Sequence, residues 1–476
     1  MAEFVRSRRP IDERVTRFLC ATTHLDGSFA NHAWVVLLSP GRQGQAPEQE
    51  IDPVAVARHS ILSLSRRVRR DRRLALVLAI AIVLAVLFFT VGTEGGASLG
   101  DVALTIIVLP LVGWLVALAV VYNHYSQVRH SAIDIHSNRL GKARRSAPPL
   151  APDVEARLDE VHRSNIAIFN RYVPFVGTGH TLDTWKLTLH TNPDGATFGD
   201  PGRTTPGVFI FPEEVHHYLY EQVPKVLPRV DAERRLYVDG GTATYVPGLI
   251  PPSPGPRRPV RPETIADDHM LDEYTRRPTR TARTYVCFVE NSGNGDVVVT
   301  VLVRAEMVGD TVYIEGRSQV LLPVQPGFKD VYWVSHRPDQ AVLPVLRAAI
   351  PATTGLWLES PLRLLRYWWS DRQDERTIRL EGLRIARGQP VNYGAGSSLR
   401  EDAMLPADPG YYGAADEVMY FRVMTQQILT CLSTFLQKKG VPTEDFEEQR
   451  RLIVEQTFNV DGIRNDAPKG TANLAL

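Results

Sequence analysis

Cysteine is scarce in this sequence, and the net charge is close to zero. Three cysteines, Cys20, Cys287 and Cys431, lie far apart among 476 residues, and no CxxC pair occurs. These absences exclude a disulfide framework and a zinc knuckle, and they favour a reducing compartment. The formal net charge is +1. The chain as a whole is therefore not a polyelectrolyte, and nucleic acid is not expected among its partners.

Motifs of the common catalytic classes are missing as well. The sequence has no HExxH zinc motif, no GxSxG nucleophile elbow, no protein-kinase set and no Cys-His arrangement with local support. We therefore predict that the protein is not an enzyme, and we name no catalytic residue, metal or cofactor. Residues that are distant in sequence can still form a triad in space, so this prediction concerns local patterns alone.

Two stretches contain residues of the metal-binding types without a metal-binding pattern. Glu213 and His217 are four residues apart on a predicted helix, a spacing at which two side chains can share a metal ion. The acidic stretch around His269 can attract a cation, but it lacks the spacing of a calcium loop. A surface ion pair is the commoner arrangement on a helix, so no metal site is predicted.

Two long runs lack any charged residue, at 74–91 and 102–122. At about 1.5 Å rise per residue, a helix over the first run spans roughly 27 Å, close to the hydrocarbon thickness of a bilayer. The second run contains Pro110 and Gly113, which a helix in lipid tolerates. The two runs predict a two-helix transmembrane hairpin, and we expect membrane lipid to be a partner of its helices.

Basic residues flank these runs on one side only. The segment that joins the runs carries just Glu94 and Asp101, whereas arginines precede the first run and further basic residues follow the second. By the positive-inside rule, we expect a multi-pass protein of the plasma (cell inner) membrane with both termini in the cytoplasm. The arginines can also bind anionic lipid, or they can serve only to fix the topology. They are Arg66, Arg67, Arg69, Arg70, Arg72 and Arg73.

Neither run contains an ionisable residue, and intramembrane charges are the usual mark of ion pathways. We therefore prefer a plain anchor to a transporter. An oligomeric pore lined by Thr90, Thr105 and the backbone at Gly113 stays open as the alternative.

The fold class that we predict is α+β, with the transmembrane hairpin joined to a cytoplasmic domain that has a mainly antiparallel sheet flanked by helices. Three β-branched runs within 283–324 are joined by turn residues, which is typical of an antiparallel meander. Both alternating sets of the middle run are apolar, so we expect both sheet faces to be covered, with helices on at least one. Farther along, Phe421, Met424, Ile428, Cys431 and Phe435 form a helical seam, which fits a buried core helix or the pairing of two protomers.

These patterns divide the chain into six expected parts. The parts are an N-terminal cytoplasmic helical region (1–73), the hairpin (74–122), a basic juxtamembrane linker (123–155), a cytoplasmic α+β domain (156–350), a C-terminal helical region (351–458) and a tail (459–476).

An amphipathic helix is expected at 361–372 within the C-terminal region. Its apolar arc contains Trp368 and Trp369, and its polar arc contains Arg363 and Arg366. Such a helix can lie among lipid headgroups, with tryptophans in lipid and arginines on phosphates. Packing of the same arc against the sheet is the alternative.

The stretch VNYGAGSSLRE, residues 391–401, is rich in glycine and serine ahead of a short predicted helix. It lacks the third glycine of a dinucleotide fingerprint and the lysine of a Walker loop. Ser398 and Glu401 match a capping box, in which each side chain accepts from the other's backbone N–H. We therefore expect a turn, with a weak alternative anion site at the helix start. The residues of that candidate site are Gly394, Gly396, Ser397 and Ser398.

Several segments resemble a group of uncharacterised actinomycete integral membrane proteins. They are RFLCATTHLD, VPFVGTGHTLDTW, LYVDGG, VNYGAGSSLRE and EDFEEQRRLIVEQTFNVDG. The resemblance implies a basic pre-membrane helix, a two-span hairpin and a cytoplasmic α+β region. It implies no activity and no catalytic residue.

Two functions fit a minimal anchor attached to a large domain with few motifs. The first is a membrane-anchored scaffold or sensor, which acts through protein partners, as yet unknown, at the inner leaflet. The second is a membrane-perturbing effector in stress or phage defence, which acts through oligomerisation of the hairpin and through the Trp-Arg helix. A homo-oligomer is possible in either case.

Overall fold

The structure is a computed structural model. It describes residues 13–39, 43–94, 99–137, 143–170, 172–190, 210–252, 260–292, 296–309, 311–331, 342–387, 389–406, 411–441 and 443–465.

A six-stranded sheet forms the centre of the part of the described chain that lies beyond the two long helices. Its order is β1-β3-β4-β5-β6-β2, and only β1 and β3 pair in parallel. The strands are β1 (Ile166–Phe169), β2 (His180–His190), β3 (Val230–Asp239), β4 (Ala282–Ser292), β5 (Val297–Val308) and β6 (Thr311–Leu321). The predicted α+β class and the meander over β4, β5 and β6 are confirmed, and the sheet is mixed because of the one parallel pair.

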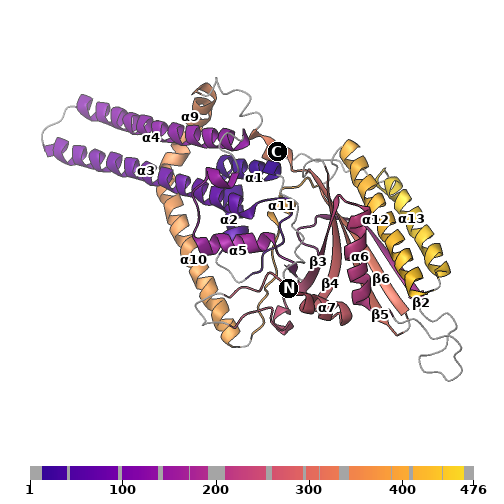
Figure 1. Ribbon diagram of the computed structural model, residues 1–476. Coiled ribbons are helices and arrows are strands. Elements are labelled where there is room, and N and C mark those ends of the chain that lie inside the picture. The colour runs from indigo at the N-terminus through magenta and orange to yellow at the C-terminus, as the bar shows by residue number, and fades with distance from the viewer. Residues whose placement is uncertain are drawn as a thin grey trace.

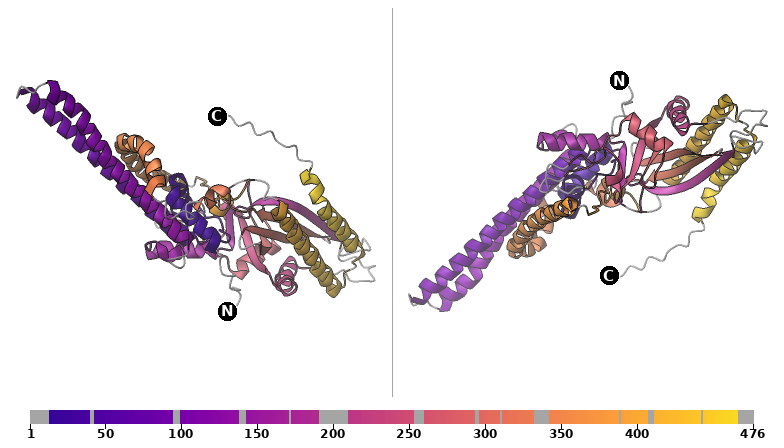
Figure 2. Two further views of the ribbon diagram at one scale, coloured as in Figure 1. Left: turned by 90° about the horizontal axis from the view of Figure 1, so that it is seen from above. Right: turned by 90° about the horizontal axis from the view of Figure 1, so that it is seen from below.

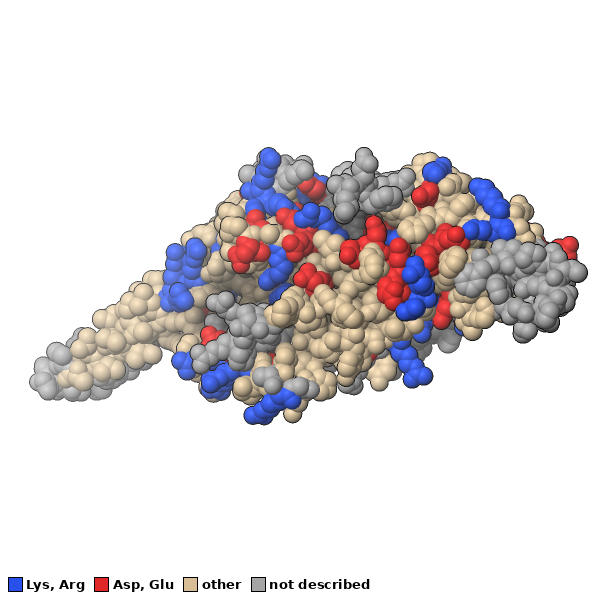
Figure 3. Space-filling model, turned by 60° about the horizontal axis from the view of Figure 1, so that its bottom comes forward, with Lys and Arg blue, Asp and Glu red and all other residues tan. Residues whose placement is uncertain are grey.

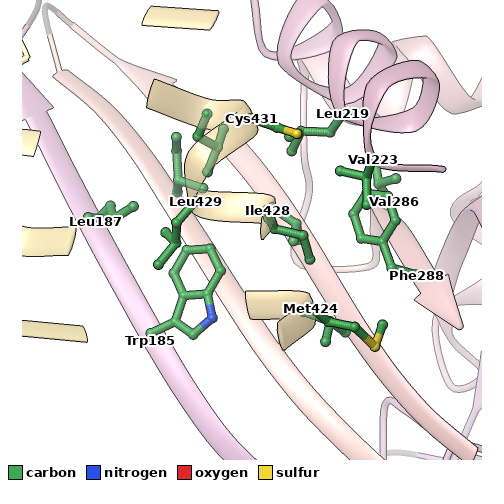
Figure 4. Packing of buried hydrophobic residues seen from close by; sticks show 14 of the residues in the cluster. Trp185, Leu187, Leu219, Val223, Val286, Phe288, Met424, Ile428, Leu429 and Cys431 are labelled. Carbon is green, nitrogen blue, oxygen red and sulfur yellow. The ribbon is translucent and has the colours of Figure 1, made fainter. Parts of the chain in front are cut away.

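Helices cover one face of this sheet (Figure 1). They are α6 (Pro212–Val226), α7 (Asp268–Arg276), α12 (Tyr411–Lys439) and α13 (Glu444–Asn465). Figure 4 shows Ile428 and Leu429 of α12 pointing into the same core as Trp185 of β2 and Phe288 of β4. Gly316 of β6 makes room for the indole, because a Cβ atom there would lie 2.0 Å from the Trp185 ring.

The helical seam of α12 is part of this core. Its five apolar residues are all buried against the sheet, so the interpretation as a core helix is confirmed. The boundary expected at residue 350 therefore does not separate two cores, since α12 and the strands bury their side chains together.

Two long helices lie side by side and project from the rest of the molecule (Figures 1 and 2). They are α3 (Pro53–Glu94) and α4 (Leu99–His136), which we call the helical hairpin. Arg66 bonds Ser131, Leu74 packs on Val121, and Gly113 lies beside Ala81. Because the residue number rises on α3 as it falls on α4, the two helices are antiparallel.

The pre-membrane helix and the first apolar run form one uninterrupted helix of 42 residues, α3. Asp52 caps its start as expected, since its Oδ1 accepts from the N–H groups of Val54 and Ala55 at 3.0 and 3.2 Å. The first half of α3 is buried among α1 (Glu13–Leu25), α2 (Gly27–Leu38) and α5 (Pro152–His162). We call this group of four helix segments the N-terminal lobe.

By length and composition, one described helix can cross a membrane, over Ile107–His136 of α4. This range contains the second apolar run in part, and the first run is not among such helices in the described part of the chain. The membrane hairpin of the sequence prediction therefore stays a proposal, while the pairing of α3 with α4 is a feature of the structure.

Two further helices cross the hairpin. They are α9 (Val342–Leu358), which contacts α4 and α3, and α10 (Ser360–Ala386), which contacts α3. The amphipathic helix is therefore longer than the predicted 361–372, and it follows an apolar helix that the sequence patterns did not single out. The remaining short helices are η1 (Ala143–Ser146), η2 (Ala243–Tyr245), η3 (Pro326–Lys329) and α11 (Leu399–Asp402).

Candidate functional site

The base of the hairpin holds a buried carboxylate, Asp71 of α3, which is fully inaccessible to solvent. Arg70 donates to it from Nε at 2.9 Å, and Arg363 of α10 donates from Nε and Nη2 at 3.2 and 3.3 Å. The Tyr367 hydroxyl also donates to it, at 3.5 Å. Asp71 thus joins α10 to α3 through the Arg363 guanidinium and the Tyr367 hydroxyl, just before the first apolar run.

The energetic weight of this contact follows from its burial. Arg70 and Arg363 have side chains that are 7% and 16% exposed, so water screens the ion pairs weakly. Removing one partner of such a pair leaves an uncompensated charge, at a cost of roughly 3–5 kcal/mol. Asp71 therefore fixes the position of α10 against the hairpin.

The six arginines before the first run have two different roles. Arg66 donates to Ser131 Oγ at 2.7 Å, Arg67 donates to the His24 carbonyl at 2.9 Å, and Arg70 binds Asp71. Arg66 and Arg67 thus fasten α3 to its neighbours, and Arg70 neutralises Asp71 on the same helix. The other three, Arg69, Arg72 and Arg73, are exposed. Of these six arginines, the three exposed ones are therefore accessible for contact with lipid phosphate.

The tryptophan face of α10 points away from the protein. Trp368 and Trp369 are 47% and 53% exposed, and Leu362 and Leu365 are exposed on the same side. The guanidinium carbon of Arg372 lies 3.9 Å from the Trp368 ring centroid, a cation–π contact.

The two predicted arginines of this helix point to different sides of it. Arg366 is exposed with the tryptophans, whereas Arg363 is turned inward to Asp71. The helix therefore packs on α3 through its Arg363 and Tyr367 side, and its apolar arc is not packed against the sheet. In Figure 3 the coloured surface of the projecting part of the hairpin is tan, without Lys, Arg, Asp or Glu, while acidic and basic side chains mix over the body of the molecule.

The glycine-serine stretch holds an internal carboxylate at its helix start. Buried Glu48 accepts from the Ser398 hydroxyl at 2.8 Å, from the Leu399 N–H at 2.8 Å and from the Arg400 N–H at 3.2 Å. Burial raises the pKa of Glu48 to about 7, although these three donors favour its ionised form. The weak anion site of the sequence analysis is thus filled by the chain's own residue 350 positions away.

The remaining residues of that stretch turn and dock the chain. Gly394 lies so close to β1 that a Cβ atom would be 2.5 Å from the Phe169 carbonyl, and Ala395 N–H donates to the Ile168 carbonyl at 2.8 Å. Gly396 is exposed with open space around it, and Ser397 is half-buried. The stretch extends the edge of the sheet beside β1.

Only one of the two hydrogen bonds of the predicted capping box forms. Ser398 Oγ accepts from the Glu401 N–H at 3.5 Å. The Glu401 carboxylate does not return to Ser398, because it accepts from the Gly177 N–H at 2.6 Å instead.

The two stretches with residues of the metal-binding types, at Glu213 and His217 and around His269, contribute to side-chain pairs and not to a common metal site. Glu213 accepts from Arg276 at 2.9 Å, and His217 lies 3.3 Å from Asp272. His216 is a core residue, whose Nε2 accepts from the Ala305 N–H at 3.2 Å. Burial lowers the pKa of His216 to about 3. The described part of the chain contains no group of three or more metal-ligating side chains.

A polar row across the sheet was missed from the sequence. Arg235, Tyr285, Arg304, Glu315 and Lys186 lie opposite one another on β3, β4, β5, β6 and β2. Arg304 donates to Glu315 at 3.3 Å and stands 5.9 Å over the Tyr285 ring. Polar residues at every second position of β2, β3 and β6 are the signal that identifies such a face.

A buried histidine pair in the N-terminal lobe was also missed. His24 Nε2 lies 3.0 Å from His59 Nδ1, and His59 Nε2 lies 3.0 Å from the Ala143 carbonyl. Since a carbonyl only accepts, His59 Nε2 carries the hydrogen, and His24 Nε2 is then the donor to His59 Nδ1. Burial lowers the pKa of His59 to about 4 and that of His24 well below its usual range. Both rings are therefore neutral.

One family model matches the chain. It is described as an AbeC-like domain and matches residues 184–468, which is more than half of the sequence. The match begins within β2, includes the meander and extends through α9, α10 and α12 into the residues after α13. It excludes α3, α4 and the N-terminal lobe. No curated protein and no solved structure matches the chain.

We expect Asp71→Asn to destabilise the protein by roughly 3–5 kcal/mol, because Arg70 and Arg363 then share a buried site without a carboxylate. The measurement is urea unfolding of the full chain in mild detergent, together with trypsin cleavage at the arginines of α10. Glu359→Gln is the control, since Glu359 pairs with the same Arg363 from an exposed position and is worth at most about 1 kcal/mol. Equal effects of the two variants would show that Asp71 does not hold α10.

We expect His59→Gln to flatten the pH dependence of stability. The histidine pKa is near 6.5 in the unfolded chain and about 4 when folded. The unfolded state therefore binds more protons within this window, and stability falls as the pH drops from 6.5 to 4, by roughly 1.4 kcal/mol per pH unit. Glutamine keeps a donor and an acceptor but does not titrate.

The quantity to measure is the difference between wild type and variant, in which the opposite contribution of Glu48 cancels. Urea unfolding at several pH values between 7.5 and 4.5 gives it, with His130→Gln, at an exposed position of α4, as the control for the loss of one histidine. Parallel profiles for wild type and His59→Gln are the contradicting result.

Proposed function

The chain belongs to the AbeC-like domain family, and we propose that it is a membrane-anchored cytoplasmic scaffold or sensor. The family domain, over 184–468, carries the interaction with protein partners. The hairpin and the N-terminal lobe, which lie outside the match, hold this domain at the inner leaflet of the plasma membrane.

Exposed apolar side chains of the hairpin carry the anchoring part of this proposal. They lie on several sides of both helices. They are Leu76, Ile80, Ile82, Val83, Leu84, Val86 and Leu87 on α3, and Ile107, Val108, Leu111, Val112, Leu115 and Val116 on α4. Burying one such side chain is worth about 1.5–3 kcal/mol. A lipid environment provides this gain for all of them.

The proposed topology has two membrane crossings and both termini in the cytoplasm. The exposed arginines Arg69, Arg72 and Arg73 lie at the base of the hairpin, whereas Leu76 and Ile80 follow about one and two turns beyond Arg73. This change from cationic to apolar surface supports an interface at the level of Asp71. The N-terminal lobe and the sheet domain then share the cytoplasmic side.

The outer surface of α12 and α13 is the partner surface that we propose. Met419 and Val423 are exposed one turn apart on α12, and Leu452 is exposed on α13. Strand addition at β2 is less suited to partners, because the Gln449 side chain already bonds both the N–H and the carbonyl of Thr188, at 3.1 and 2.9 Å. The helices therefore offer a better surface than the strand edge.

A membrane-perturbing effector is the second candidate, favoured by one observation. Trp368 and Trp369 are exposed beside Arg366 and Arg372 on α10, which is adjacent to the hairpin. Such a helix can disturb the packing of headgroups when many copies assemble. Overproduction without loss of membrane potential counts against this candidate.

We expect the double variant Met419→Gln and Val423→Gln to lose its protein partners while it stays in the membrane. Glutamine preserves the helix and removes the apolar surface. The measurement is crosslinking in intact cells, purification in mild detergent and mass spectrometry. Val226→Gln, which replaces an exposed valine of α6 outside this surface, is the control and keeps the wild-type set. Recovery of only self-contacts and lipid with the wild type contradicts the scaffold.

A further inference from the structure

The apolar helix α9 is unusually exposed for its composition. Among its 17 residues, VLPVLRAAIPATTGLWL, only Arg347 is charged. Ile350 and Leu358 are 43% and 56% exposed, and Leu343 is exposed on the same side. Other residues of the helix, which include Ala349 and Trp357, are buried against the hairpin.

The contacts of α9 place it beside the second apolar run. A Cβ atom on Gly113 would lie 2.9 Å from the Trp357 ring, so the glycine makes room for this indole. Trp114 donates from Nε1 to the Thr354 hydroxyl at 3.1 Å. Gly113 and Trp114 are in the middle of the run at 102–122. The end of α9 therefore lies in the same environment as the middle of the second apolar run.

Along α9 and into α10, the chain runs from the base of the hairpin toward the middle of the second apolar run and then back to the base. Ala349 packs with Leu74 and Val121, near the base of the hairpin, whereas Trp357 reaches Gly113. Val121 and Gly113 are eight residues apart on α4, which is roughly 12 Å along the helix. Arg363, one turn into α10, is again at the base, bound to Asp71.

We propose that α9 is a third membrane element, which enters the cytoplasmic leaflet beside α4 and does not cross it. Its exposed apolar side contacts lipid acyl chains, continuous with the exposed Leu111 and Leu115 of α4. The start of α10 leads the chain back, with Trp368 and Trp369 at the level of the headgroups. This inference rests on the proposed anchoring and specifies which segments of the protein lie in lipid.

The length and sequence of α9 fit a segment that returns. A helix that crosses the hydrocarbon needs about 20 residues, and α9 has 17 with Pro351 inside the helix. Arg347 lies ten residues before Trp357, and its long side chain can reach the interface. Ser360 Oγ donates to the Trp357 carbonyl at 2.7 Å, which satisfies one carbonyl at the end of α9.

The test uses the full chain in vesicles of phosphatidylethanolamine and phosphatidylglycerol, with nitroxide lipids that quench at headgroup or acyl depth. Single cysteines introduced at Ile350 and Leu358 carry an environment-sensitive fluorophore. Cys20, Cys287 and Cys431 are buried and do not compete for the label. Leu115 of α4 and Val226 of α6, which are 51% and 52% exposed, give matched reference sites for lipid and for water.

The expected result is acyl-depth quenching at Ile350 and Leu358 comparable to that at Leu115, with none at Val226. Quenching at Leu115 alone overturns the inference and leaves the anchor intact, and so does crosslinking of the Ile350 site to a second copy in place of quenching. Absence of quenching at Leu115 overturns the anchoring as well. Gly113→Ile, which displaces Trp357, reduces quenching at Leu358, whereas Gly355→Ala, with no atom within 4 Å, does not.

Discussion

The structure depends on one helix that passes between two different surroundings. The first half of α3 is buried in the N-terminal lobe, where Val54, Ala55 and Ala57 are inaccessible, whereas its second half exposes leucine and isoleucine side chains. Because the helix has no break between the halves, the orientation of the lobe is fixed by that of the hairpin. Asp71 lies at the transition and binds α10 there, so the same position sets where the crossing helices lie. The proposed membrane interface at this level gives each half of α3 the solvent that its surface favours.

Buried polar groups in this protein join segments that are distant in sequence. Glu48 connects the segment before α3 to α11, Asp71 connects α3 to α10, and the pair of His24 and His59 connects α1 to α3. Each group forms hydrogen bonds with a distant part of the chain, which explains why the residues most suggestive of chemistry take structural roles. A protein that positions a domain at a membrane needs such rigid joints, and this agrees with the proposed scaffold.

Sequence patterns predicted the elements whose signals are local. The α+β class, the meander and the core seam of α12 follow from periodicities of two and of three to four residues within single segments. The contacts of the candidate site could not be predicted in this way, since Asp71 and Arg363 are 292 residues apart and Glu48 and Ser398 are 350 residues apart. A capping box predicted at Ser398 formed by half, because Glu401 found a partner at Gly177. The helix α9 was overlooked because it is short, contains proline and carries an arginine. The polar row on the sheet had a readable signal, the alternation along β2, β3 and β6.

The most direct test of the account is the side of the membrane on which each part of the chain lies. Cysteines introduced at Thr93, near the outer end of α3, and at Gln437, at an exposed position of α12, are labelled with an impermeant maleimide. The account predicts labelling of the Thr93 site in intact cells and labelling of the Gln437 site only after the cells are permeabilised. Labelling of the Gln437 site in intact cells, or release of the protein from membranes by alkaline carbonate, would contradict the account.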